Sequence, residues 1–210
     1  MDEIILLGSG GHTKACIDVI ESENRFKIAG LIERDAHERN TVLGYPIIGT
    51  DVDLPRLVKQ YQYAFIAVGQ VSDSLKRRNI YKDLILLGFN IPNIISPTAY
   101  VSKYAKLGSG TIIMHSAVVN ADAQIGSNCI INNRALIEHD VTIDNHCHVS
   151  TGAIINGHSR IGEGSFVGSS AVINQCVEIV SNCVIGSCTV VTKSIPEEGI
   201  YVGNPFRKIH

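Results

Sequence analysis

Residues 125–168 read IGSNCIINNRALIEHDVTIDNHCHVSTGAIINGHSRIGEGSFVG, and an aliphatic residue recurs in this stretch at every sixth position. The same phase extends through sixteen consecutive positions, all of them Val, Ile or Leu: Val101, Leu107, Ile113, Val119, Ile125, Ile131, Ile137, Ile143, Val149, Ile155, Ile161, Val167, Ile173, Ile179, Ile185 and Val191. If about 30% of residues were aliphatic, sixteen in one phase would arise by chance on the order of once in 10⁸. A six-residue repeat therefore governs the C-terminal half of the chain.

Two other positions of the repeat have their own composition. The residue two places before each aliphatic is almost always small, as in Ala117, Cys129 and Ala135, and side chains two apart in a strand share a face. The residue just after the aliphatic is rich in Gly, Asn and Asp, which tolerate a positive φ at a turn. We therefore expect a short strand with two inward side chains, then a bend, in every hexad.

Composition excludes several classes of protein. The 210 residues carry 18 basic and 20 acidic side chains, so the basic surplus typical of nucleic-acid-binding domains is absent. The sequence has no apolar run of membrane-spanning length and no signal-peptide pattern at its start, which predicts a cytoplasmic protein without a membrane span. None of the six cysteines forms a CxxC pair, and Cys129, Cys147 and Cys183 fall in the small inward position. We expect reduced thiols that serve packing.

The N-terminal part has a different pattern. Strand-like runs at 4–8, 28–32 and 64–68 alternate with helix-like segments at 14–21, 51–60 and 72–88, which predicts a compact βαβ unit with a parallel sheet. The fold class is thus α/β plus all-β: a small Rossmann-like domain over residues 1–95, followed by a repeat domain over residues 96–210.

The first predicted strand ends in Gly8-Ser9-Gly10-Gly11-His12. A dinucleotide-binding turn would place a third glycine where Thr13 stands, so the motif is only a weak indication of NAD binding. Backbone N–H groups at such a turn also suit a phosphate, and a turn with no ligand is the remaining alternative.

The repeat resembles the hexapeptide-repeat family, with its [LIV]-G-x-x-x-x signature at Ile125-Gly126, Ile161-Gly162 and Ile185-Gly186. That resemblance implies a left-handed parallel β-helix with three hexads per coil, an acetyl-CoA-dependent acyltransferase, and a homotrimer with active sites between subunits. Together with the glycine-rich turn, it resembles the bacterial sugar acetyltransferases that include sialic acid O-acetyltransferases and bacillosamine and perosamine N-acetyltransferases.

The resemblance also implies site residues. The N-terminal domain would bind a nucleotide sugar and the solenoid would bind acetyl-CoA. Substrate contacts would come from Gly10, Gly11, His12, Glu33, Arg34, Gly69 and Asn132, and acetyl-CoA contacts from His148, Gly157, Ser169 and Ser187. An acidic residue is commoner in the family where Arg34 stands.

His139-Asp140 matches the family stretch in which the catalytic base is followed by a carboxylate, and a histidine suits proton removal at neutral pH. Because one coil has eighteen residues, His139 should stack beside Gly157 and Ala121, and Asp140 beside His158 and Asp122. His148 lies half a coil further on, so the two histidines should meet only across a subunit interface.

Three functions remain open at this level. An N-acetyltransferase acting on a nucleotide-linked amino sugar of the UDP-4-amino-4,6-dideoxy type, in bacterial surface-glycan synthesis, is the leading interpretation. O-acetylation of a sialic-acid-like sugar is the enzymatic alternative, and a non-catalytic binding scaffold is the third. A zinc site built from His139, His146, Cys147 and His148 is disfavoured because Cys147 should point inward and its neighbours outward, so no metal is expected.

Overall fold

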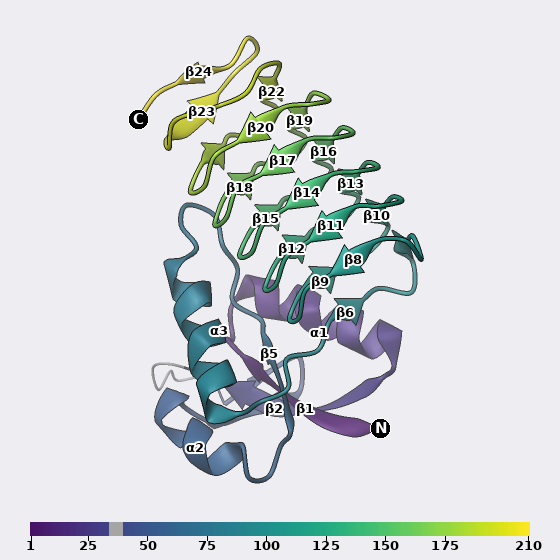
Figure 1. Cartoon of the computed structure of the whole chain (residues 1–210). Coiled ribbons are helices and arrows are strands. Elements are labelled where there is room, and N and C mark those ends of the chain that lie inside the picture. Colours follow the sequence, from purple (N-terminus) through teal and green to yellow (C-terminus); the bar gives the residue numbers. More distant parts are fainter. Residues whose placement is uncertain (34–39) are drawn as a thin grey trace.

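The computed structural model describes residues 1–33 and 40–210, which form an N-terminal α/β part beneath a long solenoid (Figure 1). The N-terminal sheet has the strand order β3-β4-β2-β1-β5. All of its pairings are parallel except that of β3 with β4. Its elements are β1 (Asp2–Leu7), α1 (Gly11–Glu23), β2 (Phe26–Ile32), β3 (Thr41–Val42), β4 (Tyr45–Gly49), the 3₁₀ helix η1 (Asp51–Asp53), α2 (Leu54–Leu57), β5 (Tyr63–Ile66) and α3 (Leu75–Leu87).

The three predicted strands and the first and last predicted helices are confirmed, but the segment between β2 and β5 differs from the prediction. The short antiparallel pair of β3 and β4 was not predicted, and the helix expected over 51–60 is only η1 followed by one turn of α2. A capping box between Thr50 and Asp53 starts this segment, and Pro55 stands in the first turn of α2. With only two residues, β3 carries too little alternation of apolar and polar side chains to be recognised in the sequence.

Thr13, the residue that breaks the dinucleotide pattern, has a structural role. Its side chain is buried, and its hydroxyl donates a hydrogen bond of 3.1 Å to the carbonyl of Ala67 just after β5. The hydroxyl therefore links α1 to the carboxyl end of β5 by a hydrogen bond. A glycine at position 13 would allow close packing but could not make this bond.

The solenoid is a left-handed parallel β-helix with three sheets, which confirms the predicted fold. Equivalent strands lie eighteen residues apart and pair in parallel, as Val118 does with Leu136 and Gln124 with Thr142. The six-stranded sheet contains β7 (Tyr100–Val101), β10 (Val118–Val119), β13 (Leu136–Ile137), β16 (Ile154–Ile155), β19 (Val172–Ile173) and β22 (Val190–Val191). The five-stranded sheet contains β8 (Lys106–Leu107), β11 (Gln124–Ile125), β14 (Thr142–Ile143), β17 (Arg160–Ile161) and β20 (Glu178–Ile179). The eight-stranded sheet contains β6 (Ile94–Ile95), β9 (Ile112–Ile113), β12 (Ile130–Ile131), β15 (His148–Val149), β18 (Phe166–Val167), β21 (Val184–Ile185), β23 (Ile200–Val202) and β24 (Arg207–Lys208).

The repeat predicts the core correctly. Every aliphatic of the series from Ile113 to Val191 is buried, and each contributes about 1.5–3 kcal/mol to stability. Cys129, Cys147 and Cys183 are free thiols with no exposed surface, as the small inward position predicts.

The expected turn position is wrong by two residues. Positive φ does not occur just after the aliphatic but three residues after it, as at Ser116, Asp122 and Asp140. Glycine is found directly after the aliphatic for a steric reason, since a Cβ on Gly126 or Gly162 would lie 2.6 or 2.4 Å from a backbone nitrogen of the next coil. At each corner, the residue directly after the aliphatic must allow close contact with the next coil, and the residue two places later adopts the left-handed conformation.

The two domains share a continuous interface. On the eight-stranded sheet, the outward residues Ile94, Ile112 and Ile130 pair in register and belong to the same buried cluster as α1. Arg77 of α3 is also fully buried there, and its guanidinium donates to the carbonyls of Ile66 and Val68 and to the side-chain oxygen of Asn128, at 2.6 Å for the last. Apolar packing and a buried cation therefore fix the domains together.

Within the described residues, no helix has the length and apolar character needed to cross a membrane.

Candidate functional site

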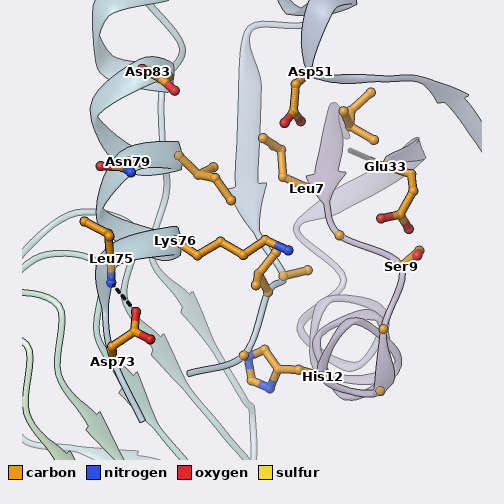
Figure 2. A pocket seen from close by; sticks show the side chains of 18 residues that line it. Leu7, Ser9, His12, Glu33, Asp51, Asp73, Leu75, Lys76, Asn79 and Asp83 are labelled. Carbon is orange, nitrogen blue, oxygen red and sulfur yellow. Dashed lines mark hydrogen bonds between the residues drawn. The ribbon is translucent and has the colours of Figure 1, made fainter. Parts of the chain in front are cut away.

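A cavity of about 810 Å³ lies at the carboxyl edge of the N-terminal sheet (Figure 2). Its walls come from the turn after β1, the start of α1, the ends of β2 and β5, and one face of α3. We call it the glycine-turn cavity. Five residues expected to bind substrate line it together: Gly10, Gly11, His12, Glu33 and Gly69.

The wall of this cavity includes polar atoms without partners among the described residues. They are Nε2 of His12 and Oε2 of Glu33, both buried. Burial, with smaller contributions from the charges of Arg77 and His148, lowers the pKa of His12 to about 3. His12 is therefore neutral at pH 7, and its buried Nε2 has no hydrogen-bond partner among the described residues.

The first turn of α1 gives the cavity a favourable site for negative charge. Gly10 is the N-cap and makes no side-chain capping bond, and the first turn of this 13-residue helix contains no acidic side chain. A Cβ on Gly10 or Gly11 would meet no atom within 4 Å, so both backbones are open to a ligand. N–H groups at such a helix start suit a phosphate.

α3 contributes lining residues to the cavity that the sequence motifs did not indicate. Figure 2 shows Lys76 reaching from α3 across the cavity toward the turn, with Asn79 and Asp83 further along the helix. Among the described lining residues, Lys76 is the one with a permanent positive charge. The predicted helix over 72–88 contained a usable signal, because a helix that follows a parallel strand begins near the carboxyl end of the sheet, and Lys76 is in its first turn.

His148 lies at the domain boundary, on the same outward ladder of the eight-stranded sheet as Ile130 and Phe166. It is 6% exposed, its Nδ1 hydrogen-bonds to the carbonyl oxygen of Gln70, and its ring centroid lies 6.5 Å from that of His12. Because Nδ1 is held by a carbonyl, Nδ1 carries the proton and Nε2 accepts from the Asn132 side chain at 3.2 Å. Burial lowers the pKa of His148 to about 4.

The sequence predicts correctly that His148 points outward from the solenoid, but the N-terminal domain covers it. His148 therefore lies beside His12, a residue of the cavity wall, and Asn132 contacts the other side of the His148 ring at Nε2. The assignment of His148 to acetyl-CoA stays a prediction.

His139 and Asp140 form a hydrogen-bonded pair on the surface of the solenoid, after β13 of the six-stranded sheet. Asp140 has a φ of 60°, and its Oδ2 lies 2.7 Å from Nδ1 of His139. The carboxylate thereby selects the tautomer with a proton on Nδ1 and a lone pair on Nε2. His139 is the nearest contact of Gly157, where a Cβ would lie 2.8 Å from its Cε1, so the predicted stacking is confirmed.

The predicted neighbour of Asp140 is also found one coil on, where Nε2 of His158 lies 3.5 Å from Oδ2. His139 and His148 belong to different sheets, as predicted from their half-coil spacing. Ser169 hydrogen-bonds to Ser150 at 3.0 Å, and Ser187 is exposed on the next coil beside Gly168. Arg34 lies outside the described residues.

The disfavoured zinc set does not converge. Cys147 is fully buried in the solenoid core, whereas His148 contacts Gln70 on the outside of the coil. The side-chain amide nitrogen of Asn128 donates to Nδ1 of His146 at 2.9 Å, in the domain interface.

Comparison with known proteins matches residues 3–84 to the PglD N-terminal domain and residues 104–138 to the bacterial transferase hexapeptide repeats. A mutant perosamine N-acetyltransferase from Caulobacter crescentus, solved with CoA and GDP-perosamine, is 28% identical over 100% of this chain and 98% of its own, with a TM-score of 0.93. The acetyltransferase domain of PglB from Neisseria gonorrhoeae is 30% identical over 100% of both chains, with a TM-score of 0.90. The same domain solved with acetyl coenzyme A is 30% identical over 99% of this chain and 98% of its own, with a TM-score of 0.91.

A comparison with curated proteins found no match. The two matched families and the full-length structural similarity nevertheless agree on one architecture and one chemistry. The chain belongs to the hexapeptide-repeat sugar acetyltransferases that carry a PglD-type N-terminal domain, and it is an acetyl-CoA-dependent acyltransferase.

Proposed function

We propose that this enzyme transfers an acetyl group from acetyl-CoA to the amino group of a nucleotide-linked 4-amino-4,6-dideoxy sugar in bacterial surface-glycan synthesis. The observation that carries the proposal is the His139–Asp140 pair, with its 2.7 Å contact at Nδ1 and a histidine that is more than half exposed. The relatives solved with CoA and GDP-perosamine, or with acetyl coenzyme A, support the choice of donor and acceptor class.

In the proposed mechanism, His139 acts at Nε2. The sugar amine attacks the thioester carbonyl, and Nε2 accepts the proton that the nitrogen loses as the tetrahedral intermediate forms. The intermediate then expels the CoA thiolate, which takes the proton from the imidazolium, so the products are the N-acetyl sugar and free CoA. Asp140 stabilises the imidazolium and holds the ring in its reactive orientation.

The glycine-turn cavity would hold the nucleotide sugar, with Gly10, Gly11, His12, Glu33, Gly69 and Arg34 as its contacts. The start of α1 and the ammonium of Lys76 face the same space, and together they suit a diphosphate. Asn132 contacts His148, whose ring lies next to His12 of the cavity wall, and we assign these two residues to the sugar or the acyl chain.

We also propose a homotrimer whose active sites lie between subunits. His139 and Asp140 are not among the described residues that line the glycine-turn cavity, so acceptor binding and base belong to separate surfaces of one chain. A neighbouring chain would bring His139 and the adjacent Gly157 against the acceptor. Ser169 and Ser187 follow strands of the eight-stranded sheet and would contact the pantetheine arm from the other side of the subunit interface. Residues 1–95 and 96–210 would be the acceptor and donor domains.

The test is a substrate screen with acetyl-CoA in which UDP- and GDP-linked 4-amino sugars and sialic acids are offered, and free thiol is measured together with the mass of the product. Amide formation on a nucleotide sugar supports the proposal. Ester formation on a sialic acid would favour the O-acetyltransferase alternative, and nucleotide-sugar binding without turnover would favour a scaffold.

A further inference from the structure

Three metal-binding side chains converge beside the proposed base. They are His139, Asp140 and His158, and one donor atom from each lies within 4.8 Å of the other two. Oδ2 of Asp140 is central, 2.7 Å from Nδ1 of His139 and 3.5 Å from Nε2 of His158. The imidazole rings meet edge to face, with centroids 5.5 Å apart.

The backbone of the solenoid holds these residues in place. Asp140 and His158 occupy the same corner of successive coils, both in the left-handed conformation, with φ values of 60° and 55°. The N–H of His158 donates to the carbonyl of His139 at 3.2 Å, which fixes the spacing of the coils at this corner. The cluster is therefore built on stacked turns of successive coils, which the flanking strands hold in register.

We propose that His139, Asp140 and His158 form a Zn²⁺ site that inhibits the enzyme. Two imidazoles and one carboxylate are a donor set that zinc prefers, and tetrahedral bonds of about 2.0–2.1 Å place ligand atoms about 3.3 Å apart. The distance from Oδ2 of Asp140 to Nε2 of His158 is already close to this value. The distance from Oδ2 to Nδ1 of His139 would increase by about 0.6 Å when a metal replaces the shared proton. The fourth position stays open to water.

Inhibition follows from the tautomer of His139, and this step rests on the proposed function. A neutral imidazole that binds zinc through Nδ1 carries its proton on Nε2. Zinc thus displaces the Nδ1 proton, and Nε2 no longer offers a lone pair to the sugar amine. The metal removes the base without displacing the ring.

Binding is measured first, on the full-length protein without substrates, by equilibrium dialysis against Zn²⁺ with metal analysis. We expect one zinc per chain, and His158→Gln should weaken binding by about tenfold or more. His115→Gln is the matched control, because Nε2 of His115 also lies 2.9 Å from a carboxylate, that of Asp18, but the described part of the chain offers this pair no third ligand. This control should bind zinc like the wild type.

Cys176→Ser tests the competing ligand set. Cys176 is an exposed thiol on the same corner as His158, one coil further on. Zinc binding should survive Cys176→Ser, and the Co²⁺-loaded protein should show no thiolate charge-transfer absorption. Loss of binding in Cys176→Ser, unchanged binding in His158→Gln, or no zinc on the wild type would each overturn the assignment.

Inhibition is measured as acetyl transfer, with the acetylated product quantified by mass spectrometry. A thiol assay is avoided because the free CoA thiol itself binds zinc. Zinc should inhibit the wild type, and EDTA should restore its activity. His158→Gln should keep its turnover without zinc and should require at least about tenfold more zinc for half-maximal inhibition. Turnover that persists with zinc bound would refute inhibition. Equilibrium dialysis measures zinc binding without any substrate. If the proposed acetyl transfer is wrong, dialysis therefore still tests the metal site.

Discussion

Nδ1 of His139 lies 2.7 Å from Oδ2 of the adjacent Asp140 because the left-handed backbone at Asp140 turns its carboxylate back toward the preceding ring. Adjacent residues in an extended strand would point to opposite faces. The bend at the corner of the coil therefore allows two neighbours in sequence to form one hydrogen-bonded pair, the proposed base and its carboxylate.

His139→Ala should lower kcat by about 10²- to 10⁴-fold, because general-base catalysis is typically worth that much. Asp140→Asn should cost less, since it keeps a hydrogen-bonding shape but loses the charge that stabilises the imidazolium. Steady-state kinetics with varied acetyl-CoA should show KM for the donor within about twofold of the wild type. His115→Ala is the control, and an unchanged kcat in His139→Ala would refute the assignment and make His148 the next candidate.

Gly157→Ala should reduce kcat by about 10²-fold through displacement of His139, because the added Cβ would lie 2.8 Å from its Cε1. The exposed ring can move, so the melting temperature should hardly change. A double-mutant cycle checks the cause: Gly157→Ala should add no further loss to His139→Ala. Additive losses would mean that Gly157 acts independently of the base, for example through the donor.

Lys76→Met should raise KM for the nucleotide sugar by about 10- to 100-fold, since a charge-assisted hydrogen bond contributes about 1.5–3 kcal/mol. KM for acetyl-CoA should stay within about twofold, because the lysine reaches into the glycine-turn cavity. Lys82→Met, on the same helix but outside the cavity wall, is the matched control. Equal effects of both variants would indicate a general charge effect rather than a phosphate contact.

Light scattering coupled to gel filtration should give a mass about three times the 22.7 kDa of one chain. At a nucleotide-sugar concentration well below KM, mixing His139→Ala chains with Lys76→Met chains under subunit exchange should give more activity than either variant alone, because an intersubunit site can draw its base and its acceptor cavity from different chains. An active monomer would contradict the intersubunit model.

Acidification should destabilise the protein through His12 and His148. Their folded-state pKa values of about 3 and about 4 lie below the ordinary value of 6.5, so the unfolded chain binds more protons between these values and pH 6.5. The free energy of unfolding should be unaffected by these groups above pH 6.5. Below it, the free energy should fall by up to about 1.4 kcal/mol per pH unit for each histidine.

Urea unfolding at pH 7, 6 and 5 measures this dependence. His148→Gln keeps a donor for the carbonyl of Gln70 but does not titrate, so its stability should fall less steeply than that of the wild type. Parallel curves for the two proteins would show that His148 titrates normally in the folded state.

The amino-acid sequence by itself determined the solenoid, its core and the stacking of His139 on Gly157, because a six-residue repeat converts chain position directly into spatial position. It also predicted the three main parallel strands around the glycine-rich turn. Only the tertiary structure decided that His148 is buried beneath the N-terminal domain, that Lys76 reaches the glycine-turn cavity, and where the left-handed corners fall. The positions of His148 and Lys76 depend on the packing of one domain against the other, and such contacts join residues with no shared period. The left-handed corners do recur every six residues, but the close packing of successive coils decides which position of the hexad adopts that conformation.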